Sequence, residues 1–411
     1  MRARSILMLA GEASGDYHAA ALVRELKLLS PGIRVTGIGG DRLAQAGMEL
    51  LHHYRDINTI GLSEGISKIR NIIAAYLTMK REIRSGKHDL FIPVDFPDVN
   101  LRLCRFAKDE GLPVYYYISP QIWAWRRGRI RKIASRVDRM MTIFPFEEQL
   151  YREAGVQANF VGHTMAHEIP AAPDKQLLRK QLGIESSGIT VAIVPGSRQA
   201  EIRRMLPVMC QAAQIYARAH PDAQFVLPLA GPHLAPAVEA IVSQYRIPVA
   251  VHLGEAAPIM AASDCGLVTS GTATLQAALA EMPHAVVYIL DGFTWWFAIK
   301  IIKPLLMDKD THVAIANVLA IHREKLGAGP IKEMLDQGFR IACHECGRPL
   351  FVPELLQHNA TPENLADWLE RFTSEEPLRQ AMIKGFRQIR EMLAPTAEGH
   401  SAAKMALEAI S

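Results

Sequence analysis

Apolar residues along this chain recur in short runs of strand length, and the segments between those runs have the period of an amphipathic helix. In the first part of the chain, helical patterns cover 18–29 and 66–85. The apolar runs are 6–10, 34–37, 90–94, 114–118, 140–144 and 158–161. Strands that alternate with helices form parallel sheets covered on both faces, so this pattern predicts a doubly wound α/β domain.

A second set of alternating elements follows a proline-containing segment at 168–174, which has no period and marks a domain boundary. Its strand candidates are 189–194, 224–229, 249–251, 265–268 and 284–289. We therefore expect two Rossmann-like domains, 1–168 and 169–373, and a helical segment at 374–411 that returns to the first domain. Parallel sheets bind ligands beyond the carboxyl ends of their strands, so two facing domains would hold a ligand in the cleft between them.

The loop after the first strand carries two carboxylates, Glu12 and Asp16, together with Gly11 and Ser14. A loop that opens a helix in this way usually presents N–H groups to a phosphate, often with a Lys. Fixed negative charges would repel a phosphate, so this loop is more typical of a site for sugar hydroxyls or for an atom that becomes positive during a reaction. The alternative is that the two acids only stabilise the start of the first helix.

A second acidic loop follows the strand at 90–94 and contains Asp95, Asp98 and Asn100. A sugar hydroxyl is a weak nucleophile, and a carboxylate beside it can take its proton as it attacks. The two acids could divide this work, one as the base and one orienting it, while Asn100 could both donate to and accept from a sugar. The structural alternative is a turn followed by a helix cap.

The second domain offers a nucleotide site in two pieces. In the first, Gly196 and Ser197 follow a buried strand, Gly196 allows close backbone approach, and Arg198 could grip two phosphate oxygens; the alternative is a turn with a surface Arg. The second piece, 269–276, has four hydroxyl side chains, and its Gln276 could reach ribose hydroxyls. Neither piece has the spacing of a P-loop or of an NAD-binding loop.

Two segments combine tryptophan with basic residues. Residues 123–139 contain seven basic residues and two Trp, and 293–307 is an apolar segment interrupted by Lys300 and Lys303. An anionic lipid surface fits the first segment better than nucleic acid does, and the second could lie at a membrane interface. The alternatives are a solvated helix face and a buried helix.

Amino-acid composition further narrows the class of protein to which this chain can belong. The 411 residues carry a net charge of +4 and 49% apolar residues, which is ordinary for a globular protein and gives nucleic acid no general reason to bind. No segment has the roughly 20 uninterrupted apolar residues of a membrane span, so we expect a cytoplasmic protein that at most lies on a membrane surface. Five scattered cysteines indicate a reducing compartment.

Eight motifs spread over nearly the whole chain resemble those of the lipid-A-disaccharide synthase family. The members of this family are glycosyltransferases with the GT-B fold. The motifs are 10–16 (AGEASGD), 95–100 (DFPDVN), 119–126 (SPQIWAWR), 144–147 (FPFE), 161–166 (VGHTMA), 195–201 (PGSRQAE), 270–275 (SGTATL) and 352–357 (VPELLQ).

The resemblance implies an activity. A UDP-activated 2,3-diacylglucosamine would be joined to 2,3-diacylglucosamine 1-phosphate with inversion at the anomeric carbon, giving the β-1,6-linked lipid A disaccharide 1-phosphate and UDP. It further implies a peripheral enzyme at the inner face of the inner membrane that needs no cofactor or catalytic metal. A homodimer is a candidate assembly.

The resemblance also implies residue roles. Asp98 would be the general base, Glu12 and Ser14 would line the acceptor side, and Arg198 would hold the diphosphate. Joined with the reasoning from the residues themselves, this gives Asp98, Glu12 and Asp95 as catalytic candidates. The candidate substrate-binding residues are Ser14, Asn100, Gly196, Ser197, Arg198, Ser270, Gly271, Thr272, Gln276 and Asn317.

The chain departs from the family in three places. Gln276 stands where the family usually has Glu, and Ile289 stands where a basic residue commonly follows the strand. About 26 residues, 321–346, are inserted next to Asn317. The insertion contains Cys343 and Cys346, which are either half a zinc site, with His322 or His312 as further ligands, or two reduced thiols.

Two other functions are compatible with these features. A UDP-N-acetylglucosamine 2-epimerase would use the same fold but would have no need of the Trp and Arg segments. A non-catalytic protein that binds nucleotide or lipid is the other alternative.

Overall fold

The structure, a computed structural model, describes residues 4–57, 65–120, 122, 127–184, 188–290, 314–325, 329–343, 347–394 and 401–411. These residues form two compact units. Unit 1 contains Met1–Thr164 together with Leu393–Ser411, and unit 2 contains the chain between Met165 and Met392. Each unit is an α/β domain built on a parallel sheet, which confirms the predicted fold class.

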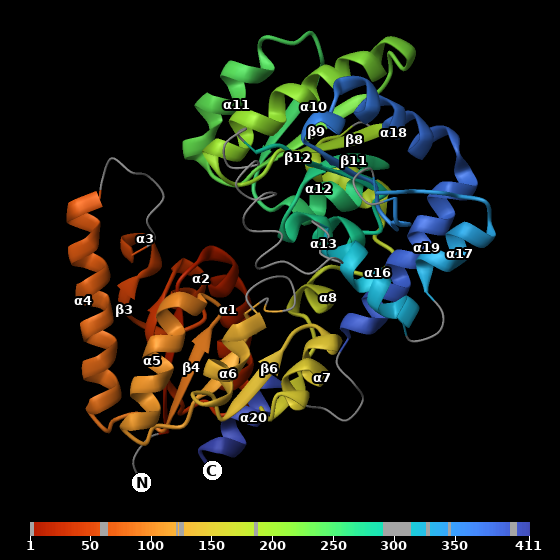
Figure 1. The fold of residues 1–411 in the computed structure, drawn as a ribbon. Coiled ribbons are helices and arrows are strands. Elements are labelled where there is room, and N and C mark those ends of the chain that lie inside the picture. The colour runs from red at the N-terminus through yellow and green to blue at the C-terminus, as the bar shows by residue number, and fades with distance from the viewer. Residues whose placement is uncertain are drawn as a thin grey trace. The chain divides into compact units, whose positions relative to one another are not determined.

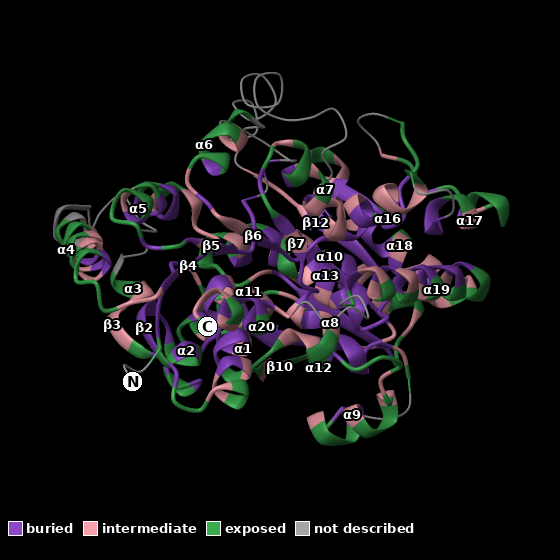
Figure 2. Ribbon diagram, turned by 90° about the horizontal axis from the view of Figure 1, so that it is seen from below, coloured by how far each residue is buried: buried purple, intermediate pink, exposed green. Residues whose placement is uncertain are grey.

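The sheet of unit 1 has seven strands in the order β3-β2-β1-β4-β5-β6-β7, and neighbouring strands pair in parallel. The strands are β1 (Ser5–Ala10), β2 (Arg34–Gly39), β3 (Glu49–His53), β4 (Leu90–Val94), β5 (Tyr115–Tyr117), β6 (Arg139–Thr142) and β7 (Ala158–Phe160). Strands β2 and β4 are buried almost throughout, as Figure 2 shows, because helices cover both faces of the sheet.

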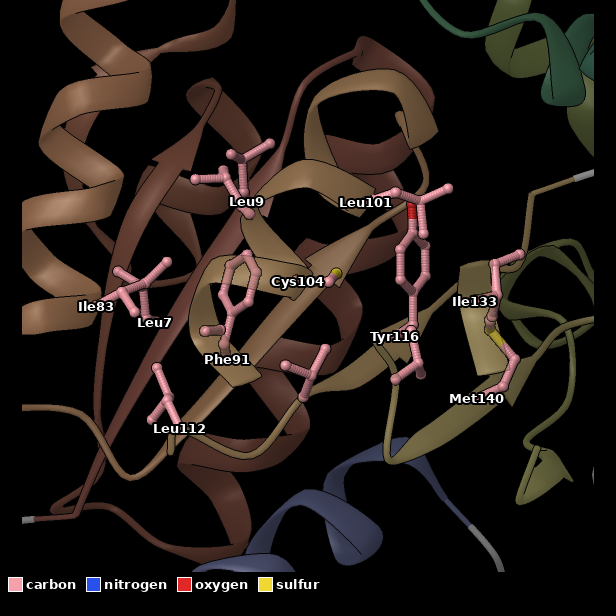
Figure 3. Close-up of a cluster of buried hydrophobic side chains, with 14 of the residues drawn as sticks. Leu7, Leu9, Ile83, Phe91, Leu101, Cys104, Leu112, Tyr116, Ile133 and Met140 are labelled. Atoms are coloured by element: carbon pink, nitrogen blue, oxygen red, sulfur yellow. The ribbon is translucent and has the colours of Figure 1, made fainter. Parts of the chain in front are cut away.

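Helices flank the unit 1 sheet, with α4, α5 and α6 together on one of its faces in Figure 1. The bounds are α1 (Ala13–Leu29), α2 (Asp41–Gln45), α3 (Tyr54–Ile57), α4 (Gly65–Arg84), α5 (Pro97–Asp109), α6 (Ile130–Ala134), α7 (Pro145–Glu153) and α20 (Ala402–Ala409). Helix α8 (Thr164–Glu168) begins where the chain leaves unit 1. The core between sheet and helices includes Leu7, Phe91 and Tyr116 (Figure 3), each of them fully buried.

The sheet of unit 2 has six strands in the order β10-β9-β8-β11-β12-β13, again in parallel pairs. The strands are β8 (Thr190–Val194), β9 (Gln224–Leu229), β10 (Val249–Leu253), β11 (Cys265–Thr269), β12 (His284–Tyr288) and β13 (Glu354–Leu356). The helices are α9 (Lys175–Leu182), α10 (Gln199–Ala219), α11 (Ala235–Val242), α12 (Ala256–Ala262), α13 (Thr272–Leu279), α16 (Ile315–Lys325), α17 (Pro330–Asp336), α18 (Pro362–Ser374) and α19 (Glu376–Leu393).

Within the described ranges, the chain passes between the units at two points. It leaves unit 1 after Thr164 and returns to it at Leu393, and the N–H of His163 donates to the carbonyl oxygen of Leu393 at 2.9 Å. The returning segment ends in α20, which packs against α1. Helix α19 belongs to unit 2, so the return begins later in the chain than the boundary at 374 that the sequence suggested.

Part of the inserted segment is folded into unit 2. Helix α17 buries Pro330 and Met334, and its Glu333 pairs with Lys384 of α19 at 2.6 Å. Gly385 of α19 allows this approach, since a Cβ there would lie 2.7 Å from the Cβ of Pro330. The middle of the insertion is therefore a helix that packs on α19.

Candidate active site

In unit 1 the structure brings the two acidic loops together. Strands β1 and β4 are neighbours, with Ala10 in register with Val94, so the loops that follow them leave the same edge of the sheet. The loops also touch, because the ring of Phe96 covers Gly11, and a Cβ on Gly11 would lie 2.8 Å or less from that ring. The order of strands reverses at this pair, which is where doubly wound sheets bind ligands.

The loop after β4 begins with two residues in the left-handed region, Asp95 with φ 45° and Phe96 with φ 48°. Asn100 supports this turn from α5: it is fully buried, and its Nδ2 donates to the carbonyl oxygens of Asp95 at 2.7 Å and Val94 at 3.3 Å. We predicted that Asn100 contacts a sugar. In the structure Nδ2 has main-chain partners, whereas Oδ1 is buried without a hydrogen-bond partner among the described residues.

The two aspartates of this loop have different surroundings. Asp95 is half-buried. Desolvation, followed by the charge of Glu12, raises the pKa of the Asp95 carboxyl to about 6, while a hydrogen bond from the N–H of Phe96 acts in the opposite direction. Asp98 lies in the first turn of α5, has a side chain that is 72% exposed, and forms an ion pair with Arg129. Either carboxylate can accept a proton, one tuned by burial and the other held by a cation.

The first loop separates its two acids in the same way. Asp16 is buried and accepts hydrogen bonds from the N–H groups of Gly40 at 2.6 Å, Arg42 at 3.2 Å and Leu43 at 3.3 Å. It therefore caps the start of α2, whereas the structural alternative placed both acids at the start of the first helix. Glu12 and Ser14 are half-buried at the start of α1, so they are the polar side chains of this loop that can meet a ligand.

In unit 2 the two predicted nucleotide pieces are also adjacent. Strands β8 and β11 are neighbours with Val194 in register with Val268, and the order of strands reverses between them. The first piece turns at Gly196, with φ 105°, and Arg198, with a side chain that is 60% exposed, directly precedes α10. The second turns at Gly271, with φ 134°, just before α13.

A carboxylate that the sequence analysis did not single out closes the first of these loops. Glu201 in the first turn of α10 accepts from the N–H groups of Ser197 at 3.1 Å and Arg198 at 3.3 Å. The spacing of Arg198 and Glu201 at the start of a helix was the signal available in the sequence, since an acid at that position often caps a helix.

The second loop presents its polar side chains around the start of α13. Gly271 and Thr272 are exposed, Ser270 and Gln276 are half-buried, and Thr274 is buried with its hydroxyl donating to the carbonyl of Gly271 at 2.9 Å. The first four remain candidates for contact with a nucleotide, while Thr274 holds the turn.

Asn317 is placed differently from the expectation. Its side chain is fully buried, and Oδ1 accepts from the N–H groups of Phe351 at 2.9 Å and Val352 at 2.8 Å. Its Nδ2 donates to the Val352 carbonyl at 2.9 Å and to Glu354 Oε1 at 2.8 Å. All of its hydrogen-bonding capacity is used within the protein, so Asn317 joins α16 to β13 instead of contacting a nucleotide directly.

Several basic side chains in the described part of the segment 123–139 have hydrogen-bond or ion-pair partners within the protein. Arg129 pairs with Asp98, Arg136 donates to the Leu101 carbonyl at 2.9 Å, and Arg131 and Lys132 are exposed on α6. Residues 123–126 and 293–307 lie outside the described residues. Among the helices that the structure describes, none combines the length and the apolar character needed to cross a bilayer.

The cysteine pair is only partly within the structure. Cys343 is half-buried, and its carbonyl accepts from the N–H of Gly347 at 2.8 Å, while Cys346 and His312 lie outside the described residues. Within the described ranges, no group of three or more His, Cys, Asp or Glu side chains is placed to hold a metal ion. Metal binding by this pair stays a prediction.

The arrangement of two such units in one chain is shared with solved structures. The glycotransferase of kitacinnamycin aligns over 100% of both chains with a TM-score of 0.58 and 14% identity. A UDP-GlcNAc 2-epimerase from Neisseria meningitidis, bound to UDP-GlcNAc, aligns over 99% of both chains with a TM-score of 0.55 and 14% identity. The fold therefore defines a two-domain protein of the GT-B class, as predicted.

Sequence comparison identifies the group within that class. Residues 6–327 match the family described as lipid-A-disaccharide synthetase. The lipid-A-disaccharide synthase of Anaeromyxobacter dehalogenans strain 2CP-1 is 41% identical over 389 residues, which cover 94% of this chain and 93% of the relative. The chain belongs to the lipid-A-disaccharide synthase family and is a glycosyltransferase, which confirms both predictions.

Proposed function

We propose that this protein joins UDP-2,3-diacylglucosamine to 2,3-diacylglucosamine 1-phosphate, with inversion, and releases UDP. Membership of the family supports this reaction, and one observation of the structure carries it: each unit brings two polar loops to the point where the strand order reverses. The acidic pair of loops in unit 1 suits an acceptor alcohol, and the pair in unit 2 suits a nucleotide diphosphate.

In the proposed reaction, the 6-hydroxyl of the acceptor attacks the anomeric carbon of the donor. The bond from that carbon to the UDP oxygen breaks, UDP leaves with the bonding electrons, and Asp98 takes the proton of the hydroxyl. The ion pair with Arg129 orients the Asp98 carboxylate before the acceptor binds. Glu12, Asp95 and Ser14 complete the acceptor side.

On the donor side, charge and hydrogen bonding divide between the two loops of unit 2. Arg198 would hold the diphosphate by charge-assisted hydrogen bonds, and Ser270, Gly271 and Thr272 would contact it at the start of α13. Gln276 would hydrogen-bond the ribose without adding a charge. Gly196 and Ser197 shape the first loop around Glu201.

We further propose that the enzyme works on the surface of an anionic membrane, at the inner face of the inner membrane. Helix α4 supports this, because its Ile73 and Leu77 are 52% and 56% exposed and lie on the same side as the exposed Arg70 and Arg81. A helix surface with apolar side chains flanked by cations suits acylated, phosphorylated substrates and lipids. A homodimer stays a candidate assembly.

The test is to supply the purified protein with both acylated sugars and to measure UDP and disaccharide together. Equal amounts of the two products are expected. Turnover of the UDP-sugar without acceptor would favour the epimerase, and binding of both sugars without turnover would favour the non-catalytic alternative.

A further inference from the structure

We propose that Tyr116 and Asn100 are positioning residues of the transfer site, which act by holding the left-handed turn at Asp95 and Phe96. This inference rests on the proposed function, since it concerns the same acceptor side. It adds two buried residues that contact no substrate, and it explains how the site keeps its two aspartates in place.

The turn is fixed through a single carbonyl group. The carbonyl oxygen of Asp95 accepts from the hydroxyl of Tyr116 at 2.6 Å and from Nδ2 of Asn100 at 2.7 Å. The N–H of Asp95 donates to the carbonyl of Tyr117 at 3.0 Å. The main chain is therefore held from β5 on one side and from α5 on the other.

This holding is needed because the turn is strained. Asp95 and Phe96 are consecutive residues with φ of 45° and 48°, a region that residues with a side chain enter only when their surroundings impose it. Phe96 is also pressed against Gly11, where the lack of a side chain leaves room for its ring. The hydrogen bonds of Tyr116 and Asn100 supply the remaining constraint.

Tyr116 is suited to this role by its burial. Figure 3 shows its ring among Cys104, Ile133 and Met140, with the hydroxyl oxygen at the end of the ring nearest Leu101. The side chain is fully buried, so the ring has no room to move away from the turn. Burial also keeps the pKa of Tyr116 well above its ordinary value, so the hydroxyl stays protonated and remains a donor at neutral pH.

The turn matters for the reaction because Asp95 and Asp98 stand on either side of it. Strand β4 ends at Val94 and α5 begins at Pro97, so the two left-handed residues alone set the direction in which α5 starts. A small rotation there would move Asp98 relative to Asp95 and Glu12. Misplacement of a catalytic group by about 1 Å can cost about a hundredfold in rate.

The experiment compares Tyr116→Phe with Tyr117→Phe. Both tyrosines are buried on β5, but the hydroxyl of Tyr117 contacts Thr164 Oγ1 at 3.2 Å instead of the turn. We expect Tyr116→Phe to lower kcat by about tenfold or more with KM for the donor unchanged, while Tyr117→Phe leaves kcat within about twofold. Asn100→Ser should resemble Tyr116→Phe.

A second measurement does not depend on activity. Amide hydrogen exchange at residues 95–98 should be faster in Tyr116→Phe than in the wild type, and unchanged in Tyr117→Phe. If the wild type makes no disaccharide while the exchange changes as expected, the proposed function fails and the role in the turn stands. Unchanged exchange and an unchanged kcat in Tyr116→Phe would overturn the inference, as would equal losses in both variants.

Discussion

The carboxylate of Glu201 fills the space that a side chain on Gly196 would need. A Cβ on Gly196 would lie 2.9 Å from the Cβ of Glu201, and Oε2 of Glu201 accepts from the N–H groups of Ser197 and Arg198. The first loop of the candidate donor site is thus closed by a negative charge of the protein itself, at the place where a diphosphate is expected.

This relationship predicts a gain in affinity. Glu201→Gln removes the charge that competes with the diphosphate for Arg198 and for the loop, so the KM for the UDP-sugar should fall by about threefold or more. Steady-state kinetics measure it, with Glu239→Gln, an exposed glutamate on α11, as the matched control. A KM that rises or stays constant would contradict competition by Glu201.

The roles of the two sides of the site can be separated with Asp98. Asp98→Ala should abolish transfer, because no group would remain at that position to take the proton of the acceptor hydroxyl. UDP binding should be largely intact, since the nucleotide loops belong to unit 2. Calorimetric titration with UDP and an assay of disaccharide test the two halves of this prediction, and normal turnover would remove Asp98 as the base.

Arg198 should contribute to donor binding through charge. Arg198→Ala is expected to weaken binding of the UDP-sugar by about 2 kcal/mol, as for the loss of a charge-assisted pair. Arg203→Ala, on the same helix and exposed, serves as the control for a general loss of positive charge. The role is refuted if both variants bind the donor as the wild type does.

The half-buried carboxyl of Asp95 should make stability depend on pH. Its pKa rises from 3.8 to about 6 on folding, so the folded protein binds more protons than the unfolded chain between about pH 4 and pH 6. This group therefore makes the protein less stable as the pH rises through that range, by up to about 3 kcal/mol.

Asp95→Asn removes this dependence. Its free energy of unfolding relative to the wild type should increase from pH 4 to pH 7, as measured by urea denaturation at a series of pH values. A constant difference between the two proteins across that range would show that Asp95 titrates normally.

The apolar side chains of α4 should promote membrane binding. Replacement of Ile73 and Leu77 by Ser should reduce sedimentation with vesicles that contain anionic lipid, with little change in melting temperature because both side chains are exposed. Leu28→Ser, on α1 and 82% exposed, is the matched control. Equal binding by all three proteins would show that the exposed surface of α4 is an ordinary solvated helix surface without a role in membrane binding.

The sequence predicted the central strands of both sheets because these are buried on both faces and read as continuous apolar runs. It missed two strands. β3 consists of Glu49 to His53, which mixes polar and apolar residues at the sheet edge, and β13 includes Glu354, whose carboxylate is buried against Asn317. Neither has the apolar run by which a buried strand is recognised.

The adjacent loops of the site could also be predicted, because parallel strands end at a common edge. The direction of individual polar side chains could not. Asp16, Asn100 and Asn317 lie in motifs typical of ligand binding, yet each of them forms hydrogen bonds with main-chain groups of the protein. A sequence shows which polar atoms a loop carries, but whether they face a ligand or the backbone depends on turns such as that at Asp95.

The return of the chain to unit 1 affects how the nascent protein matures. A ribosome delivers α1 well before α20, and the strands of unit 2 are made in between. Unit 2 can complete its sheet before α20 is made, whereas the surface of α1 that α20 covers stays bare until α20 emerges. This uncovered helix is the place where a chaperone, or a premature encounter with another nascent chain, would act.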